Sequence, residues 1–128
     1  MRPNEEYIIC KQVSQYLRLQ YPKTIYHFDL AGLNLSKAQA GMMKAIQGNR
    51  GYPDLTIVKS NNGYHGMFLE LKKEGTKIFL KDGKTVVAND HIQEQYYMLA
   101  RLRLSNYYAE FAIGFEDAKK QIDNYLKL

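Results

Sequence analysis

The feature that most constrains this 128-residue chain is a pair of short apolar runs separated by a turn. Residues 55–58 (Leu-Thr-Ile-Val) and 66–72 (Gly-Met-Phe-Leu-Glu-Leu-Lys) are typical of strands, and residues 61–63 (Asn-Asn-Gly) are typical of a hairpin turn. Because side chains alternate along a strand, Glu70 and Lys72 share a face of the second strand. The two runs therefore predict a strand pair that carries charged side chains among apolar neighbours.

Asp54 begins the first of these strands, directly after Pro53. The hairpin brings Asp54 beside Glu70, and two adjacent carboxylates repel each other unless a cation or a proton lies between them. A hard divalent ion bound by one or two carboxylates, water and a phosphate resolves this repulsion, and Lys72 would position or deprotonate the attacking water. Taken singly, each residue is equally well explained by an ordinary turn or a solvated charge. In combination they favour phosphodiester hydrolysis.

The rest of the pattern predicts one α/β domain, spanning residues 1–128, around a small mixed sheet. Helices are expected at 4–20, 36–46, 90–104 and 116–126, strands at 24–28 and 107–115, a second hairpin at 78–87 and a loop at 29–36. We expect Ser36 and Asp90 to cap their helices. His91, near a helix start, is interpreted as a surface or capping residue.

Charge and cysteine content limit the partners and the compartment. The net charge of +5 favours polyanionic partners, and the single cysteine, Cys10, excludes an internal disulfide and fits a reducing compartment. Cys10 lies on an apolar helix face and is expected to be packed rather than reactive. No run approaches the length of a membrane span, and the first residues lack a secretory apolar core, so we expect a cytoplasmic protein.

Three short motifs carry a resemblance to a known family. Residues 51–55 (Gly-Tyr-Pro-Asp-Leu), 68–72 (Phe-Leu-Glu-Leu-Lys) and 92–95 (Ile-Gln-Glu-Gln), in this order, resemble the VRR-NUC branch of the PD-(D/E)XK nucleases. The resemblance extends over nearly the whole chain, including the acidic start of the first helix and the last strand and helix. It implies a restriction-endonuclease-like αβββαβα core, in which helices flank a small mixed β-sheet.

The resemblance also implies a role for each matching residue. Asp54 and Glu70 would be the acidic ligands of Mg²⁺ or Mn²⁺, Leu71 would offer its backbone carbonyl to the ion, and Lys72 would be the active-site lysine. These residues match the family's motif position by position.

Two positions of the family pattern have alternatives in this sequence. The acid of the first helix is Glu6 or Glu5, and we favour Glu6 because it shares a helix face with Cys10 and points toward the core. The glutamine of the downstream helix is Gln95 or Gln93, and we favour Gln95 because it shares a face with apolar residues of that helix.

Standalone members of this family resemble phage-type enzymes that act as homodimers on branched DNA, in the host cell when phage-encoded. The resemblance therefore implies a homodimer that hydrolyses DNA and resolves Holliday junctions. No membrane is expected as a partner. A flap, nicking or restriction-like nuclease on the same scaffold, or a non-catalytic nucleic-acid-binding module, is the alternative. The segment 75–89 is longer than the shortest family connections and would extend the sheet, contact DNA or serve in dimerisation.

Overall fold

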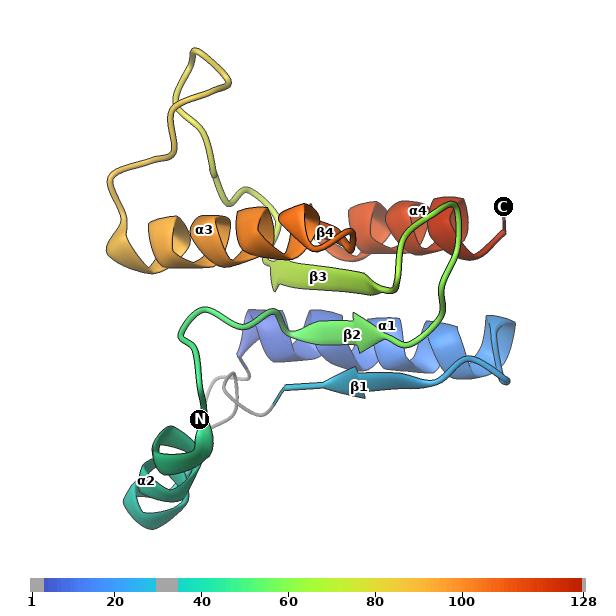
Figure 1. The fold of residues 1–128 in the computed structure, drawn as a ribbon, viewed down its shortest axis with the longest axis horizontal. Helices are drawn as coiled ribbons and strands as arrows, with labels where there is room; N and C mark the ends of the chain where they lie inside the picture. Colours follow the sequence, from blue (N-terminus) through green and yellow to red (C-terminus); the bar gives the residue numbers. More distant parts are fainter. Residues whose placement is uncertain (1–3, 30–34, 128) are drawn as a thin grey trace.

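The computed structural model describes residues 4–29 and 35–127, which form a four-stranded mixed sheet covered by helices on both faces (Figure 1). In chain order the elements are α1 (Glu5–Gln20), β1 (Tyr26–Phe28), α2 (Lys37–Ile46), β2 (Leu55–Ile57), β3 (Met67–Lys72), α3 (Asp90–Leu104), β4 (Tyr108–Ile113) and α4 (Phe115–Leu126). The expected α/β fold is confirmed, with the short helix α2 between the first two strands of the αβββαβα order. Most of the loop expected at 29–36 lies outside the described residues.

The strand order is β1-β2-β3-β4, with the first three strands antiparallel and β4 parallel to β3. A parallel pair needs a crossover connection, and α3 supplies it across one face of the sheet. In the register of β2 with β3, Leu55 lies opposite Leu69. The next position along this register pairs Asp54 with Glu70, which is the adjacency that the hairpin pattern predicts.

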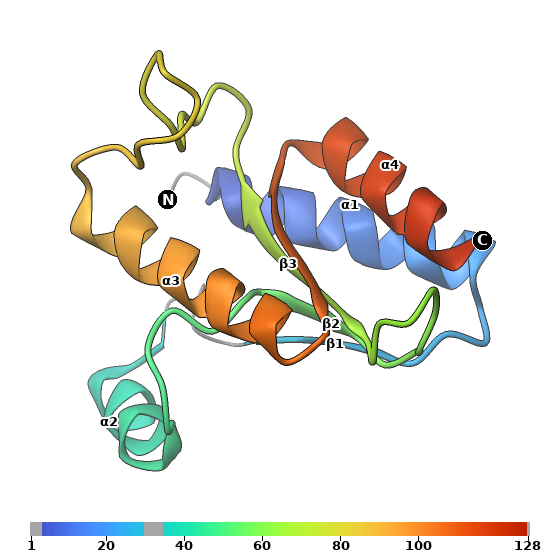
Figure 2. The ribbon, with the colours of Figure 1, turned by 45° about the horizontal axis from the view of Figure 1, so that its top comes forward.

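The two faces of β3 pack against different helices, as Figure 2 shows. Met67, Leu69 and Leu71 are fully buried in the main core beneath α1 and α4. On the opposite face, Phe68 belongs to a smaller cluster with Leu99 of α3. Glu70 and Lys72 share the face of Phe68, so the charged residues of β3 lie on the α3 side.

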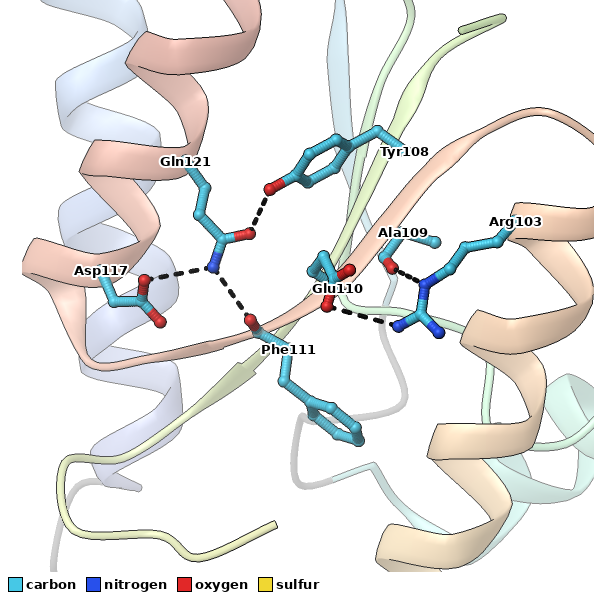
Figure 3. A network of polar contacts seen from close by, with 7 residues as sticks. All are labelled: Arg103, Tyr108, Ala109, Glu110, Phe111, Asp117 and Gln121. Atoms are coloured by element: carbon cyan, nitrogen blue, oxygen red, sulfur yellow. Dashed lines mark hydrogen bonds and ion pairs between the residues drawn. The ribbon is translucent and has the colours of Figure 1, made fainter. Parts of the chain in front are cut away.

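β4 is held between α3 and α4 by a polar network (Figure 3). Gln121 of α4 accepts a hydrogen bond from the Tyr108 hydroxyl at 2.7 Å and donates one to the Phe111 carbonyl at 2.9 Å. From the other side, the Arg103 Nε of α3 donates to the Ala109 carbonyl at 2.7 Å. These bonds fix β4 beside β3, and β3 carries the candidate site. Arg103 therefore has a structural role.

The segment 75–89 contains the hairpin that the sequence predicts at 78–87: the Leu80 amide donates to the Thr85 carbonyl at 2.8 Å, and the Val87 amide donates to the Ile78 carbonyl at 2.9 Å. One isolated bridge joins Phe79 to Val86, and the four-stranded sheet does not include this segment. Of the three roles that the sequence leaves open for this segment, extension of the sheet is therefore excluded. Its residues are mostly exposed and give a strand no face to bury, whereas Ile78 and the ring of Phe79, which is edge-on to Tyr96, anchor its base.

Helix caps follow the sequence at α2 and differ at α3. Ser36 and Gln39 form the reciprocal capping box of α2. At α3 the cap is Asn89 rather than the expected Asp90, because Asn89 keeps an extended backbone and its side chain accepts from the Ile92 amide at 3.0 Å. Asp90 is instead the first residue within the helix.

Helix α2 and the segment 75–89 both project from the body of the fold. In Figures 1 and 2 they extend from the end of the sheet at which β3 ends and α1 and α3 begin. No described residue of α2 is buried, and Met42 and Ile46 are 70% and 80% exposed. Across the described residues, no helix is long and apolar enough to cross a membrane.

Candidate active site

The site lies where β2 begins and β3 ends. Asp54 directly precedes β2, and its Oδ2 accepts a hydrogen bond from the backbone amide of Leu71 at 2.8 Å. The Leu71 side chain points into the main core and is fully buried. The backbone of β3 therefore fixes the Asp54 carboxylate beside the last residues of that strand.

Glu70 is buried at the centre of the site, with 3% of its surface exposed. Its Oε1 accepts a hydrogen bond from Gln95 Nε2 at 2.7 Å, whereas its Oε2 is buried and has no hydrogen-bond partner among the described residues. Burial, and next the nearby Asp54 carboxylate, raise the pKa of Glu70 well above its ordinary value. Burial also raises the pKa of Asp54, although a hydrogen bond with the Glu70 carboxyl group, and next the Leu71 amide, oppose this change.

Lys72 lies on the same face of β3 as Glu70 and is 5% exposed. Its positive charge lowers the pKa of both Asp54 and Glu70, although burial outweighs this effect in each case. The structure therefore brings together the three residues that the strand-pair pattern selects.

Glu6 and Glu5 occupy different environments. Glu6 is half-buried and lines a cavity of about 130 Å³, which we call the acidic cavity; its wall includes Glu6, Asp29, Asp54, Glu70, His91 and Gln95. Glu5 is exposed and forms an ion pair of 3.8 Å with Lys73. The geometry therefore places Glu6 beside the two strand carboxylates.

The pKa of Cys10 is affected by the carboxylates of the candidate site. Its pKa is raised to about 12, chiefly by burial and then by the carboxylates of Asp54, Glu70 and Glu6. All three acids thus lie within electrostatic reach of one thiol. A thiol that stays protonated is a poor nucleophile, which agrees with the packed, unreactive Cys10 that the sequence predicts.

The two glutamines of α3 also differ in position. Gln95 is buried against Glu70, and its Nε2 lies 3.1 Å from His91 Nε2. Gln93 instead donates to the Val87 carbonyl at 3.2 Å and secures the segment before the helix. His91 is exposed, as its interpretation as a surface or capping residue predicts, and it also lines the acidic cavity; its position four residues before Gln95, on the same helix face, is the signal that could have placed it there.

Asp29 is a site residue that the sequence does not reveal. It lines the acidic cavity, and its backbone amide donates to the Asp54 carbonyl at 2.7 Å. Because Phe28 of β1 pairs with Leu55 of β2, the following residue comes opposite Asp54. A three-residue strand gives too weak a pattern to predict this register in advance.

Gly51 lets the loop before Asp54 approach α3. Its φ of +72° is a left-handed conformation that favours glycine, and a Cβ at this position would lie 3.0 Å from the Glu94 carbonyl oxygen and 3.3 Å from the Gln95 amide nitrogen. The glycine that opens the Gly-Tyr-Pro-Asp-Leu motif thus allows the loop to pack against the helix turn that carries Gln95.

The donor set fits a hard divalent cation. The described residues contain no ready group of three or more histidine, cysteine or acidic side chains that would hold an ion. Mg²⁺, however, is usually held by one or two carboxylates together with water and substrate phosphate, and Asp54 and Glu70 supply two carboxylates. The buried, unpartnered Oε2 of Glu70 is the atom whose environment a cation would most improve.

The mixed sheet and its covering helices define an α/β fold with an acidic cavity at the end of the β2–β3 pair. Comparison with solved structures finds a chain described as a "VRR_NUC domain protein", with a TM-score of 0.69 and 24% sequence identity, over 100% of this chain and 93% of that one. This protein therefore has a VRR-NUC fold, as its motifs predict. No protein-family model matches the sequence, and no curated protein matches it significantly.

Proposed function

We propose that this protein is a Mg²⁺- or Mn²⁺-dependent DNA endonuclease that hydrolyses phosphodiester bonds. The observation that carries the proposal is the carboxylate pair formed by buried Glu70 and half-buried Asp54, in which one Glu70 oxygen has no hydrogen-bond partner among the described residues. When both carboxylates are ionised, such a pair is unfavourable without a cation, so its position at the end of an apolar strand supports a metal-binding role. The proposed site comprises Glu6, Asp54, Glu70, Leu71 (through its carbonyl), Lys72 and Gln95.

The reaction forms a bond between a water oxygen and phosphorus and breaks one P–O bond, leaving a phosphate on one strand end and a hydroxyl on the other. When bound, the metal ion polarises the phosphate and lowers the pKa of the attacking water. Gln95 and the Leu71 amide hold the Glu70 and Asp54 carboxylates in fixed orientations. Lys72, which is buried beside Glu70, positions the water and stabilises negative charge as it develops on the phosphate oxygens.

The positions of exposed basic residues support the proposal that DNA is the substrate. Exposed lysines lie on both projecting parts of the molecule, which extend from the end of the sheet that carries the site: Lys37 and Lys44 on α2, and Lys77, Lys81 and Lys84 on the segment 75–89. Phosphate contacts from such residues position a duplex without reading its sequence. We therefore propose selectivity for DNA structure rather than for base sequence.

We further propose a homodimer that resolves four-way junctions. A two-fold dimer presents two sites to two strands, which suits paired incisions. The exposed apolar side chains of Met42 and Ile46 on α2 are available for contact with a second copy. Sedimentation at micromolar concentration tests this part alone, and a monomer would contradict it.

Incubation of labelled four-way junction, flap and linear duplex with Mg²⁺, Mn²⁺ or EDTA tests the activity. We expect metal-dependent cleavage by the wild type, loss of about a thousandfold in kcat/KM for Glu70→Gln, and no loss for the matched control Glu116→Gln, which lies exposed on α4. Lys72→Gln should lower the rate by about a hundredfold or more.

The substrates distinguish the alternatives. Symmetric incision of the junction alone supports the resolving homodimer, whereas cleavage of flaps alone selects a flap nuclease on the same fold. DNA binding without cleavage of any substrate would contradict the catalytic assignment and leave a nucleic-acid-binding module. Full activity of both Glu70→Gln and Lys72→Gln would contradict the proposed site.

A further inference from the structure

A second cavity, of about 260 Å³, opens next to the acidic cavity, and we call it the α1 pocket. Its wall is formed mainly by one face of α1 and by the end of β1. The lining residues beyond the acidic ones are Asn4, Tyr7, Cys10, Lys11, Ser14, Arg18 and Phe28. The proposed reaction assigns no role to any of them.

The α1 pocket is continuous with the proposed site. Glu6, Asp29 and Asp54 line both cavities, so the two spaces meet at the carboxylates where the scissile phosphate is proposed to lie. A DNA strand whose phosphate occupies the acidic cavity therefore has the α1 pocket beside it. One neighbouring nucleotide of that strand lies close enough to enter.

The wall of the α1 pocket combines aromatic and cationic groups. Tyr7 is 47% exposed, and the half-buried ring of Phe28 is held edge-on to Tyr26 with 5.9 Å between ring centroids. Lys11 and Arg18 are exposed on the same wall, away from the acidic end. Rings on which a base stacks, next to cations that contact phosphate, are the usual elements of single-strand recognition.

Helix geometry and cavity size set the length of strand that fits. With a rise of about 1.5 Å per residue, Lys11 lies about 7.5 Å along the α1 axis from Glu6. This spacing suits a phosphate one nucleotide away from the scissile one. The cavity is smaller than the roughly 300–1,000 Å³ of typical ligand pockets, which suits one nucleotide and excludes a base pair.

We propose that the α1 pocket binds one unpaired nucleotide next to the scissile phosphate, with its base against Tyr7 and Phe28 and its phosphate near Lys11. This inference rests on the proposed nuclease function and deepens it, because it defines the substrate class. The enzyme cuts where a nucleotide is free to leave the stack, as it is at a branch point or a strand end.

Two readouts test the proposal. The first is kcat/KM on two branched DNAs that differ only at the nucleotide next to the cut, which is either a normal unpaired nucleotide or an abasic unit. The wild type should prefer the normal nucleotide by about tenfold, and Tyr7→Leu should lose most of this preference. The matched control Tyr97→Leu, on the exposed face of α3, should keep it.

The second readout is binding in EDTA, where turnover does not contribute. A 2-aminopurine placed at the same position should change its fluorescence on binding to the wild type, and this change should be lost in Tyr7→Leu. Lys11→Gln should weaken binding of the normal and abasic DNAs equally, by several-fold, whereas Lys120→Gln, exposed on α4, should leave binding unchanged.

Failure of the inference is distinguishable from failure of the proposed function. Metal-dependent cleavage with equal rates on normal and abasic DNA would overturn the α1 pocket assignment and leave the nuclease intact. A preference that persists in both Tyr7→Leu and Phe28→Leu would also overturn it. Absence of cleavage on every DNA would overturn the proposed nuclease and, with it, this inference.

Discussion

The two faces of β3 belong to the same six residues of chain and are built from opposite chemistry. On the α1–α4 face, Met67, Leu69 and Leu71 are fully buried among aliphatic side chains. On the α3 face, Phe68 packs in a smaller apolar cluster, whereas Glu70 and Lys72 are almost as deeply buried, with Asp54 and Gln95 next to Glu70. One face stabilises the fold, whereas the other contains charges whose burial opposes folding.

This difference shows how a short strand separates stability from chemistry. The apolar face holds the backbone of β3 in place, and that backbone in turn holds Asp54 through the Leu71 amide. Substitutions on the apolar face should therefore change the fraction of folded protein, and substitutions on the polar face should change metal binding and cleavage.

Leu69→Ala removes a fully buried side chain from the apolar face. We expect the free energy of unfolding to fall by about 2–5 kcal/mol, from lost burial and the cavity left behind, with kcat per folded molecule retained. Urea denaturation and active-site titration measure the two quantities. Leu104→Ala, at an exposed position on α3, should change stability by less than about 0.5 kcal/mol, and an equal effect there would contradict the assignment of the core.

Gly51→Ala tests the close approach between the motif loop and α3. We expect a loss of about 1–3 kcal/mol of stability, because the left-handed φ of +72° and the 3.0 Å contact with the Glu94 carbonyl both oppose a Cβ. Gly63→Ala is the matched control, since its φ is +81° but no atom lies within 4 Å of the added carbon. Equal losses in the two variants would show that the contact with α3 has no effect.

Gln95→Leu removes the hydrogen bond to Glu70 and leaves the two proposed metal-binding carboxylates in place. We expect the Mg²⁺ concentration at half-maximal cleavage to rise by about tenfold, with kcat at saturating metal largely retained. Gln93→Leu, which loses only its bond to the Val87 carbonyl, should leave the metal titration unchanged. If the Mg²⁺ concentration at half-maximal cleavage rose in Gln93→Leu and not in Gln95→Leu, Gln93 rather than Gln95 would be the glutamine of the site.

Much of this site follows from elementary periodicities. Strand alternation places Glu70 and Lys72 on one face, the hairpin register places Asp54 beside Glu70, and the helical repeat separates Glu6 from Glu5. These predictions succeed because each depends on a few neighbouring residues in a regular element, where geometry leaves little freedom.

The remaining features depend on contacts between distant segments. Asp29 enters the site through the pairing of a three-residue strand. The predicted hairpin at 78–87 forms but stays outside the four-stranded sheet, because a local turn sequence does not supply a sheet edge or a face to bury. The wall of the α1 pocket likewise comes from both α1 and the end of β1, and no spacing of residues in the sequence predicts that these two segments lie together.

The central claim is that the polar face of β3 is a metal site that opposes folding when no metal is bound. Because the pKa of Glu70 is raised in the folded state, the folded protein holds this proton to a higher pH than the unfolded chain does. Stability should therefore fall as the pH rises from the ordinary glutamate pKa of 4.5 through the raised value. Glu70→Gln removes the titrating group and should flatten this decline.

The most direct test is the free energy of unfolding of wild type and Glu70→Gln at neutral pH, with and without Mg²⁺. Without metal, we expect the variant to be the more stable protein. Mg²⁺ should stabilise the wild type, by about 2.7 kcal/mol at one hundred times its Kd, and should leave the variant nearly unchanged. A variant that is less stable than the wild type without metal, and that gains as much from Mg²⁺, would contradict the account.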